Sequence, residues 1–179
     1  MTGAIKHALA AASAAALLAP GAGFAADITF PVFRIGDQGV GEKIGAVRAF
    51  DTKNGLRLAP RLAGLPPGEH GFHVHEKADC GPAGANNQRG PGLAAGGHYD
   101  PEGAKQHAGP KGRGHKGDLP SLTVAADGAA RTSVIADRLK VEDLRGRALM
   151  IHAGGDNYAD QPQPLGGGGA RIACATIPR

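Results

Sequence analysis

Two histidines in one short segment could bind the same metal ion. His73 and His75 lie two positions apart in the run Gly71-Phe72-His73-Val74-His75. In a β-strand, residues two apart project from the same face, so both imidazoles would face one side while Phe72 and Val74 face the core. Neutral imidazole is a ligand for both copper and zinc. The spacing therefore predicts two ligands for one ion.

More candidate ligands follow along the chain. They are three histidines and an aspartate in a Gly- and Pro-rich stretch, and one histidine at the end of a predicted strand: His98, His107, His115, Asp118 and His152. Spacings of eight or nine residues are typical of loop ligands that folding brings together, not of one helix face. One such residue alone would be interpreted as an exposed loop residue, but the whole set favours a metal site.

The number of donors limits the arrangement. Two four-coordinate sites need eight bonds, and the set offers seven side chains. Either one histidine bridges two ions, or one site stays open. A carboxylate suits zinc better than copper, so Asp118 is assigned to zinc. His70 has the opposite parity to His73 in the strand, so we expect it to bond to nearby backbone instead.

Strands must position these residues. Apolar residues alternate or run together in about eight short segments between turn signals, which is the pattern of strands rather than helices. The predicted strands cover approximately residues 28–35, 43–51, 55–61, 70–76, 119–125, 130–136, 147–153 and 170–177. Asn54-Gly55 and Asp127-Gly128 each predict a hairpin, and residues 141–144 are predicted to form one short helical turn.

Two long segments, residues 77–118 and 154–169, are predicted to stay irregular. Loops this long in a compact domain are usually functional or disordered, and the histidines favour function. Antiparallel strands with such connections fit a Greek-key sandwich or flattened barrel with the loops over one side. The predicted fold class is therefore all-β.

The composition supports one globular domain of this class. The 30 glycines and 13 prolines among 179 residues disfavour long helices. With 41% apolar residues and a net charge of +4, the chain is not expected to be disordered. The length suits a single domain, and the charge is too small to indicate a nucleic-acid partner.

The first 25 residues have the pattern of a signal peptide. Lys6 is the only charged side chain before Asp27, and an apolar run of roughly a dozen residues follows it. That run is too short to span a membrane. Gly23 and Ala25 place small residues where a signal peptidase cleaves, so we expect residues 1–25 to be removed and residues 26–179 to form the domain. A buried Ala-rich helix is the alternative.

Export would place the two cysteines, Cys80 and Cys174, in an oxidising compartment. Only one intramolecular pairing is available to them, so we predict one disulfide, with two buried free thiols as the alternative. On the chain-entropy model, closing a loop of this size would stabilise the fold by about 4 to 5 kcal/mol.

Four segments together resemble the copper/zinc superoxide dismutases, specifically their exported bacterial branch. The segments are Gly71-Phe72-His73-Val74-His75, Gly96-Gly97-His98-Tyr99-Asp100-Pro101, Gly114-His115-Lys116-Gly117-Asp118-Leu119-Pro120 and Gly166-Gly167-Gly168-Gly169-Ala170-Arg171-Ile172-Ala173-Cys174. The likeness runs in order over essentially the whole mature chain, and no ligand position is altered. It implies an eight-stranded Greek-key β-barrel and a periplasmic location. Residues 80–97 are the least familiar part.

The resemblance implies a role for each candidate residue. Copper would be held by His73, His75, His98 and His152. Zinc would be held by His98, His107, His115 and Asp118, so that His98 bridges the two ions and seven side chains fill eight positions. Cys80 and Cys174 match the disulfide of the family. Arg171 matches an arginine that draws the anionic substrate toward copper, and Asp156 matches a carboxylate that connects a copper ligand to a zinc ligand.

The implied activity is superoxide dismutation, in which copper is alternately reduced and reoxidised while superoxide becomes dioxygen and hydrogen peroxide. His98 would release copper on reduction and carry a proton, and the closed zinc position would hold the loop. The fixed guanidinium of Arg171 presents donors to a small anion. Lys111, Arg113 and Lys116 could add to this field, although a solvated loop face is the preferred interpretation.

Two other functions could use some of the same donors. An exported copper/zinc storage or delivery protein would use the same donors, but it needs no cation such as Arg171 beside a metal ion. A structural zinc domain would leave His73, His75 and His152 unexplained. Residues 112–117 match the dinucleotide pattern G-x-G-x-x-G by letter, yet no strand precedes them and no helix follows. The sequence does not decide between a monomer and a homodimer.

Overall fold

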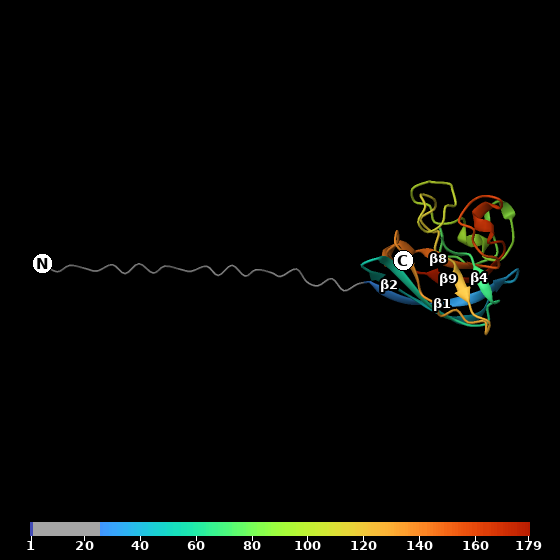
Figure 1. The fold of residues 1–179 in the computed structure, drawn as a ribbon, viewed down its shortest axis with the longest axis horizontal. Helices are drawn as coiled ribbons and strands as arrows, with labels where there is room; N and C mark the ends of the chain where they lie inside the picture. Colours follow the sequence, from blue (N-terminus) through green and yellow to red (C-terminus); the bar gives the residue numbers. More distant parts are fainter. Residues whose placement is uncertain (2–25) are drawn as a thin grey trace.

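The structure, a computed structural model, describes Met1 and residues 26–179 (Figure 1). The predicted signal peptide lies outside the described residues, except for Met1. The described part holds nine β-strands, four short 3-10 turns and no α-helix. The strands are β1 (Asp27–Gly36), β2 (Gly39–Thr52), β3 (Gly55–Leu62), β4 (Gly68–His70), β5 (Phe72–His75), β6 (Leu122–Val124), β7 (Val134–Ala136), β8 (Arg147–His152) and β9 (Arg171–Ile177); the turns are η1 (Ala85–Asn87), η2 (Leu93–Ala95), η3 (Val141–Leu144) and η4 (Pro164–Gly167). Within the same residues, no helix is long and apolar enough to cross a membrane.

Seven strands form one antiparallel sheet in the order β5-β8-β9-β1-β2-β3-β7, and β4 pairs with β6 in a second ladder. Figure 1 shows the strands curled around a common core, with the long loops gathered beyond one side. The predicted all-β, antiparallel fold is confirmed. Residues 77–118 and 154–169 contain no named strand, as predicted, and η3 coincides with the predicted helical turn at residues 141–144.

The predicted strand at residues 70–76 is broken at Gly71, which raises the number of strands to nine. The Gly71 N–H donates to the carbonyl of Gly154 at 2.7 Å, and the Gly71 carbonyl accepts from His152 N at 2.9 Å. Gly71 therefore bonds outside the β4–β6 ladder. On either side of it, β4 pairs with β6 and β5 pairs with β8.

Of the two predicted hairpins, only one joins paired strands. Asn54 lies in the turn between β2 and β3, where Thr52 pairs with Gly55. Asp127-Gly128 also forms a tight turn, closed by Gly128 N donating to Ala125 O at 2.9 Å. However, β6 and β7 pair with β4 and β3, not with each other, so the second hairpin prediction is wrong. A local turn signal cannot reveal which strand takes the neighbouring edge.

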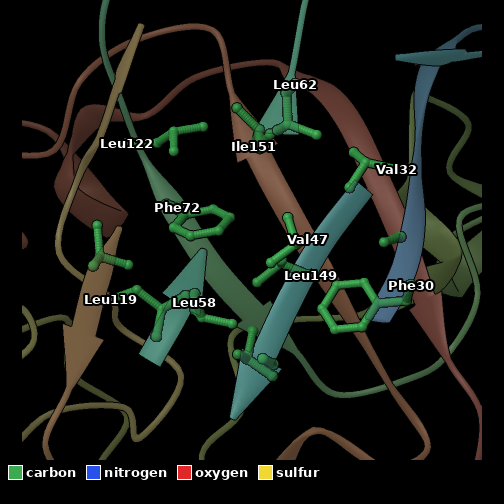
Figure 2. Packing of buried hydrophobic residues seen from close by; sticks show 14 of the residues in the cluster. Phe30, Val32, Val47, Leu58, Leu62, Phe72, Leu119, Leu122, Leu149 and Ile151 are labelled. Carbon is green, nitrogen blue, oxygen red and sulfur yellow. The ribbon is translucent and has the colours of Figure 1, made fainter. Parts of the chain in front are cut away.

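A single main core fixes the face on which the predicted ligands lie. Its buried side chains come from both halves of the chain and include Phe30, Val32, Val47, Leu58, Leu62, Phe72, Leu119, Leu122, Leu149 and Ile151 (Figure 2). Burying one such side chain stabilises the fold by roughly 1.5 to 3 kcal/mol. Because Phe72 and Val74 belong to this core, His73 and His75 must face the other side of β5. A slip of one residue would exchange the two sets.

A smaller apolar cluster holds the segment after β5 against the sheet. It consists of Ile35, Cys80, Ala95, Ala148, Met150 and Cys174. Within it, Cys80 and Cys174 form the predicted disulfide, with their Cα atoms 5.9 Å apart across 94 residues of sequence. The bridge ties this segment to β9.

Candidate metal centre

Four histidines form a first ligand group: His73, His75, His98 and His152. One nitrogen of each ring lies within 4.8 Å of one nitrogen of every other, and all four residues are buried. His73 and His75 come from β5, and His152 ends the neighbouring strand β8. The spacing of the pair on β5 therefore places both side chains in one group, as their parity predicted.

Three nitrogens in the first ligand group are buried without a hydrogen-bond partner: His73 Nδ1, His75 Nε2 and His152 Nε2. The opposite nitrogen of His75 lies 3.0 Å from the carbonyl oxygen of Gly96, and that of His152 lies 3.2 Å from the carbonyl oxygen of Gly169. A carbonyl oxygen only accepts, so the Nδ1 atoms of His75 and His152 carry the hydrogen and donate it. In a neutral imidazole the other nitrogen, Nε2, then carries a lone pair. Buried lone pairs without partners are costly, so their convergence fits a bound cation.

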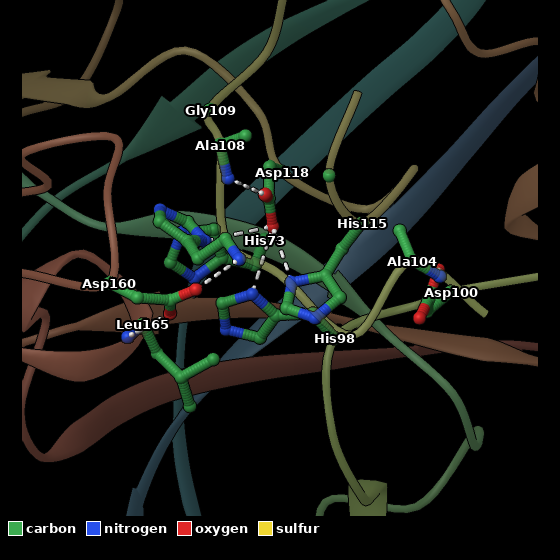
Figure 3. A network of polar contacts seen from close by, with 12 residues as sticks. His73, His98, Asp100, Ala104, Ala108, Gly109, His115, Asp118, Asp160 and Leu165 are labelled. Carbon is green, nitrogen blue, oxygen red and sulfur yellow. Dashed lines mark hydrogen bonds and ion pairs between the residues drawn. The ribbon is translucent and has the colours of Figure 1, made fainter. Parts of the chain in front are cut away.

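The second ligand group consists of His98, His107, His115 and Asp118. The Oδ1 atom of Asp118 lies 2.9, 3.1 and 3.4 Å from the Nδ1 atoms of His98, His107 and His115 (Figure 3). Donors at the corners of a tetrahedron with zinc bonds of 2.0 to 2.1 Å would be about 3.3 Å apart. The group therefore fits a closed tetrahedral site.

His98 belongs to both ligand groups. Its Nδ1 faces Asp118, so only Nε2 is left for the first group. Seven side chains thus provide eight donor positions, because His98 contributes one nitrogen to each group. Of the two alternatives left by counting the ligands, a bridging histidine and an open site, this arrangement is the bridging histidine.

Backbone hydrogen bonds attach both ends of the ligand loop, residues 98–118, to the free edge of β5. Tyr99 N donates to Val74 O at 2.8 Å, and Val74 N donates to Gly117 O at 2.9 Å. A Cβ atom at Gly117 would collide with the carbonyl oxygen of Val74. The strand that carries His73 and His75 therefore also positions the ends of the loop that carries the other ligands.

Asp156 connects the two groups. Its Oδ2 lies 2.8 Å from His73 Nε2, and its Oδ1 lies 2.8 Å from His107 Nε2. Burial would raise the pKa of this carboxyl, but hydrogen bonds from His107 and His73 hold the pKa well below its usual range. The ionised carboxylate accepts from both rings and so turns His73 Nδ1 and His107 Nδ1 toward the ligand groups.

Arg171 lies at the start of β9, opposite His152 in the pairing with β8. Its guanidinium donates to Gly92 O at 2.6 Å and to Gly96 O at 2.7 Å. The same Gly96 oxygen accepts from His75, so one carbonyl connects Arg171 to a residue of the first ligand group. A guanidinium has five N–H donors, so these two bonds do not use all of its donors.

A family model described as copper/zinc superoxide dismutase (SODC) matches residues 44–177. This chain belongs to the copper/zinc superoxide dismutase family. It is 52% identical over 141 residues to "Superoxide dismutase [Cu-Zn]" of Escherichia coli (strain K12). The aligned residues cover 78% of this chain and 82% of the relative.

Two solved structures from the same family have a similar fold. The copper/zinc superoxide dismutase from Brucella abortus aligns with a TM-score of 0.82 and 45% identity, covering 85% of this chain and 99% of the other. The monomeric copper, zinc superoxide dismutase from Salmonella enterica aligns with a TM-score of 0.75 and 49% identity, with the same two coverages.

The surroundings of the first ligand group keep its histidines uncharged, which is the form of imidazole that binds a metal ion. Burial, together with neighbouring imidazoles, lowers the pKa of His73 to about 3 and that of His152 to about 4. In the second group, burial opposes protonation of His107, but hydrogen bonds with Asp118 and Asp156 raise its pKa to about 9. Without metal at neutral pH, the first group is therefore neutral, and the second holds a cation between two carboxylates.

Asp160 contacts the site in a way that the sequence did not predict. Asp160 accepts from His107 N at 2.9 Å and from Leu165 N at 3.2 Å, which joins the loop at residues 154–169 to the ligand loop. No spacing in the sequence could signal the contact between Asp160 and His107, because 53 residues separate them. His70, by contrast, bonds to backbone, as its parity predicted. Its Nδ1 lies 2.7 Å from His152 O, and its Nε2 lies 2.8 Å from Pro66 O.

The glycines at 112, 114 and 117, which match the dinucleotide pattern by letter, have a packing role in this family member. A Cβ atom at each would collide with the backbone carbonyl of Ala108, Gln106 and Val74, respectively. The letter match therefore reflects a loop folded tightly on itself and against β5.

Proposed function

We propose that this chain is a superoxide dismutase, with copper held by the first ligand group and zinc by the second. The observation that carries the proposal is the convergence of three buried, unpartnered histidine nitrogens beside an anchored guanidinium. Membership of the copper/zinc superoxide dismutase family supports the choice of metals and substrate. A storage site would gain nothing from a cation at Arg171.

Each residue then has a defined task. Bound copper supplies one-electron exchange, and zinc, closed by its four protein ligands, supplies fixed structure. The guanidinium of Arg171 attracts and orients the superoxide anion, because it is always charged and two carbonyls fix its direction. His98 can hold a proton at Nε2 during turnover while its Nδ1 remains in the second group. Asp156 keeps His73 and His107 in the required tautomers.

We further propose that residues 1–25 direct export to the bacterial periplasm and are then removed, leaving residues 26–179 as the enzyme. The N-terminal sequence pattern and the Cys80–Cys174 disulfide support this location, since disulfides persist in oxidising compartments. Sizing of the purified protein distinguishes a monomer from a homodimer. The Salmonella enterica relative is described as monomeric.

Metal content and superoxide decay measured on the same sample test the function. The purified protein should take up one copper and one zinc and accelerate superoxide decay, and the metal-free protein should not. A protein that holds both metals but leaves the decay rate unchanged would show a storage role instead. N-terminal sequencing of the periplasmic protein should begin at Ala26, give or take one residue.

A further inference from the structure

One arginine outside both ligand groups contacts the ligand loop with its whole guanidinium. Arg138 follows β7 and is partly buried. Its four hydrogen bonds all go to backbone carbonyls of one short stretch: Nε to Pro110 (3.2 Å), Nη1 to Gly114 (3.1 Å), and Nη2 to Gly109 (3.4 Å) and His115 (2.6 Å). The shortest of these bonds is to a member of the second ligand group.

The stretch that Arg138 binds has no strand or helix to fix its carbonyls. Buried carbonyls need donors, and a guanidinium presents five N–H groups in one rigid plane. One side chain can therefore fix four carbonyls relative to each other. Lysine, with a single flexible ammonium, has no comparable geometry.

A second contact from the same segment reaches the other side of His115. Lys116 Nζ lies 2.7 Å from Asp143 Oδ1, and the other oxygen of Asp143 accepts from Lys140 N at the start of η3. The connection between β7 and β8 thus holds the ligand loop at two adjacent places. By contrast, His73 and His75 lie on β5 and His152 ends β8, so pairing between these two strands positions all three residues.

We propose that Arg138 is a positioning residue for the second ligand group. By fixing the carbonyl of His115 and its neighbours, it keeps His115 Nδ1 at ligand distance from Asp118 Oδ1, and it thereby sets the affinity for zinc rather than for copper. The inference rests on the proposed function, because it takes the second group as the zinc site.

The test compares Arg138→Gln and Arg138→Lys with Arg131→Gln. Arg131 is a matched control, because its side chain is 64% exposed and pairs with Asp127. Zinc and copper affinities of the metal-free proteins are measured by chelator competition, and the absorption spectrum of Co²⁺ bound in place of zinc reports the ligand geometry. Urea unfolding of the metal-free proteins records any general loss of stability.

Arg138→Gln should weaken zinc binding about 10-fold to 100-fold, the range for residues that orient metal ligands, and alter the Co²⁺ spectrum while copper affinity is unchanged. Arg138→Lys should weaken zinc less, and Arg131→Gln should match the wild type. Wild-type zinc affinity in Arg138→Gln, or equal losses of zinc and copper, would overturn the inference. If Arg138→Gln does not fold, Arg138→Lys is used in its place, and wild-type zinc affinity or equal losses of zinc and copper in that variant would overturn the inference. A wild-type protein that does not bind zinc would instead defeat the proposed function.

Discussion

The imidazole of His73 and the carboxylate of Asp156 are joined by a 2.8 Å contact, although 83 residues separate them in the sequence. The same carboxylate reaches His107, so a single side chain orients one ring in each ligand group. Its replacement therefore tests how strongly the two groups depend on each other.

Replacing Asp156 with Asn should weaken zinc binding about 10-fold to 100-fold, because an amide cannot accept from both imidazoles in the same way. Chelator competition on the metal-free protein measures the effect. Asp37→Asn, at an exposed turn, is the control and should bind zinc like the wild type. Unchanged zinc affinity in Asp156→Asn would mean that the carboxylate does not orient His107.

Removing single ligands should separate the two metals. His152→Ala should lose copper and retain zinc, and His115→Ala should lose zinc and retain copper, because each side chain belongs to one group only. His98→Ala should impair both. Metal content after dialysis, measured by elemental analysis, distinguishes these outcomes. A His98→Ala protein that loses only one metal would exclude a shared histidine.

Arg171→Ala should lower the dismutation rate on the order of 10-fold or more, with metal content unchanged, because the cation attracts an anionic substrate. The rate should also depend less on ionic strength than in the wild type. The dismutation rate of Arg171→Lys should lie between those of the wild type and Arg171→Ala. Lysine keeps the charge, but its ammonium lacks the fixed fork that binds Gly92 and Gly96. Equal rates at low salt for the wild type and Arg171→Ala would rule out steering by this residue.

The metal-free protein should lose stability as the pH falls below about 6.5, the ordinary pKa of histidine. His73 and His152 titrate at about 3 and about 4 in the folded state, so below pH 6.5 the unfolded chain binds more protons and is favoured. For His152 the loss should reach about 2 kcal/mol by pH 5. His107 has a pKa of about 9 in the folded state, so its protonation stabilises the folded protein at lower pH. This stabilisation is lost as the pH rises from about 6.5 through 9. Urea unfolding across this range should therefore show greatest stability near neutral pH, and His152→Ala should reduce the acid loss.

Gly166→Ala should disturb the Asp156 carboxylate. Gly166 has a φ of +73°, and a Cβ atom there would collide with Asp156 Oδ1 and lie 2.8 Å from His107 Nε2. We expect weaker zinc binding, as in Asp156→Asn. Gly169→Ala is a close control, because its φ is +67° but no atom lies within 4 Å of the added Cβ. Similar zinc losses in both variants would assign the effect to backbone strain rather than to the collision.

The parts of the site that the sequence could predict are those fixed by short-range geometry. The parity of β5 placed His73 and His75 together and set His70 apart. The two cysteines had one possible pairing, which the structure contains. Sharing of His98 was only one of two alternatives by counting, and the family resemblance was needed to choose it.

The parts that could not be predicted depend on contacts between distant segments. The break at Gly71 arises because Gly154 and His152 take its hydrogen bonds. The contacts of Arg138 and Asp160 with the ligand loop likewise have no local signature. Such features follow from which segments meet in three dimensions, and no spacing along the chain records this.

The antiparallel ladder between β5 and β8 also determines when the chain can first present the complete first ligand group. Its partners, including Phe72 and Ile151, are separated by about half of the domain, and pairings at such distance form slowly because closing a long loop costs conformational entropy. A partly made or partly folded chain has His73 and His75 but not His152 beside them. Copper captured before that ladder forms would lack its complete ligand set, so redox activity is limited to molecules whose barrel is already assembled.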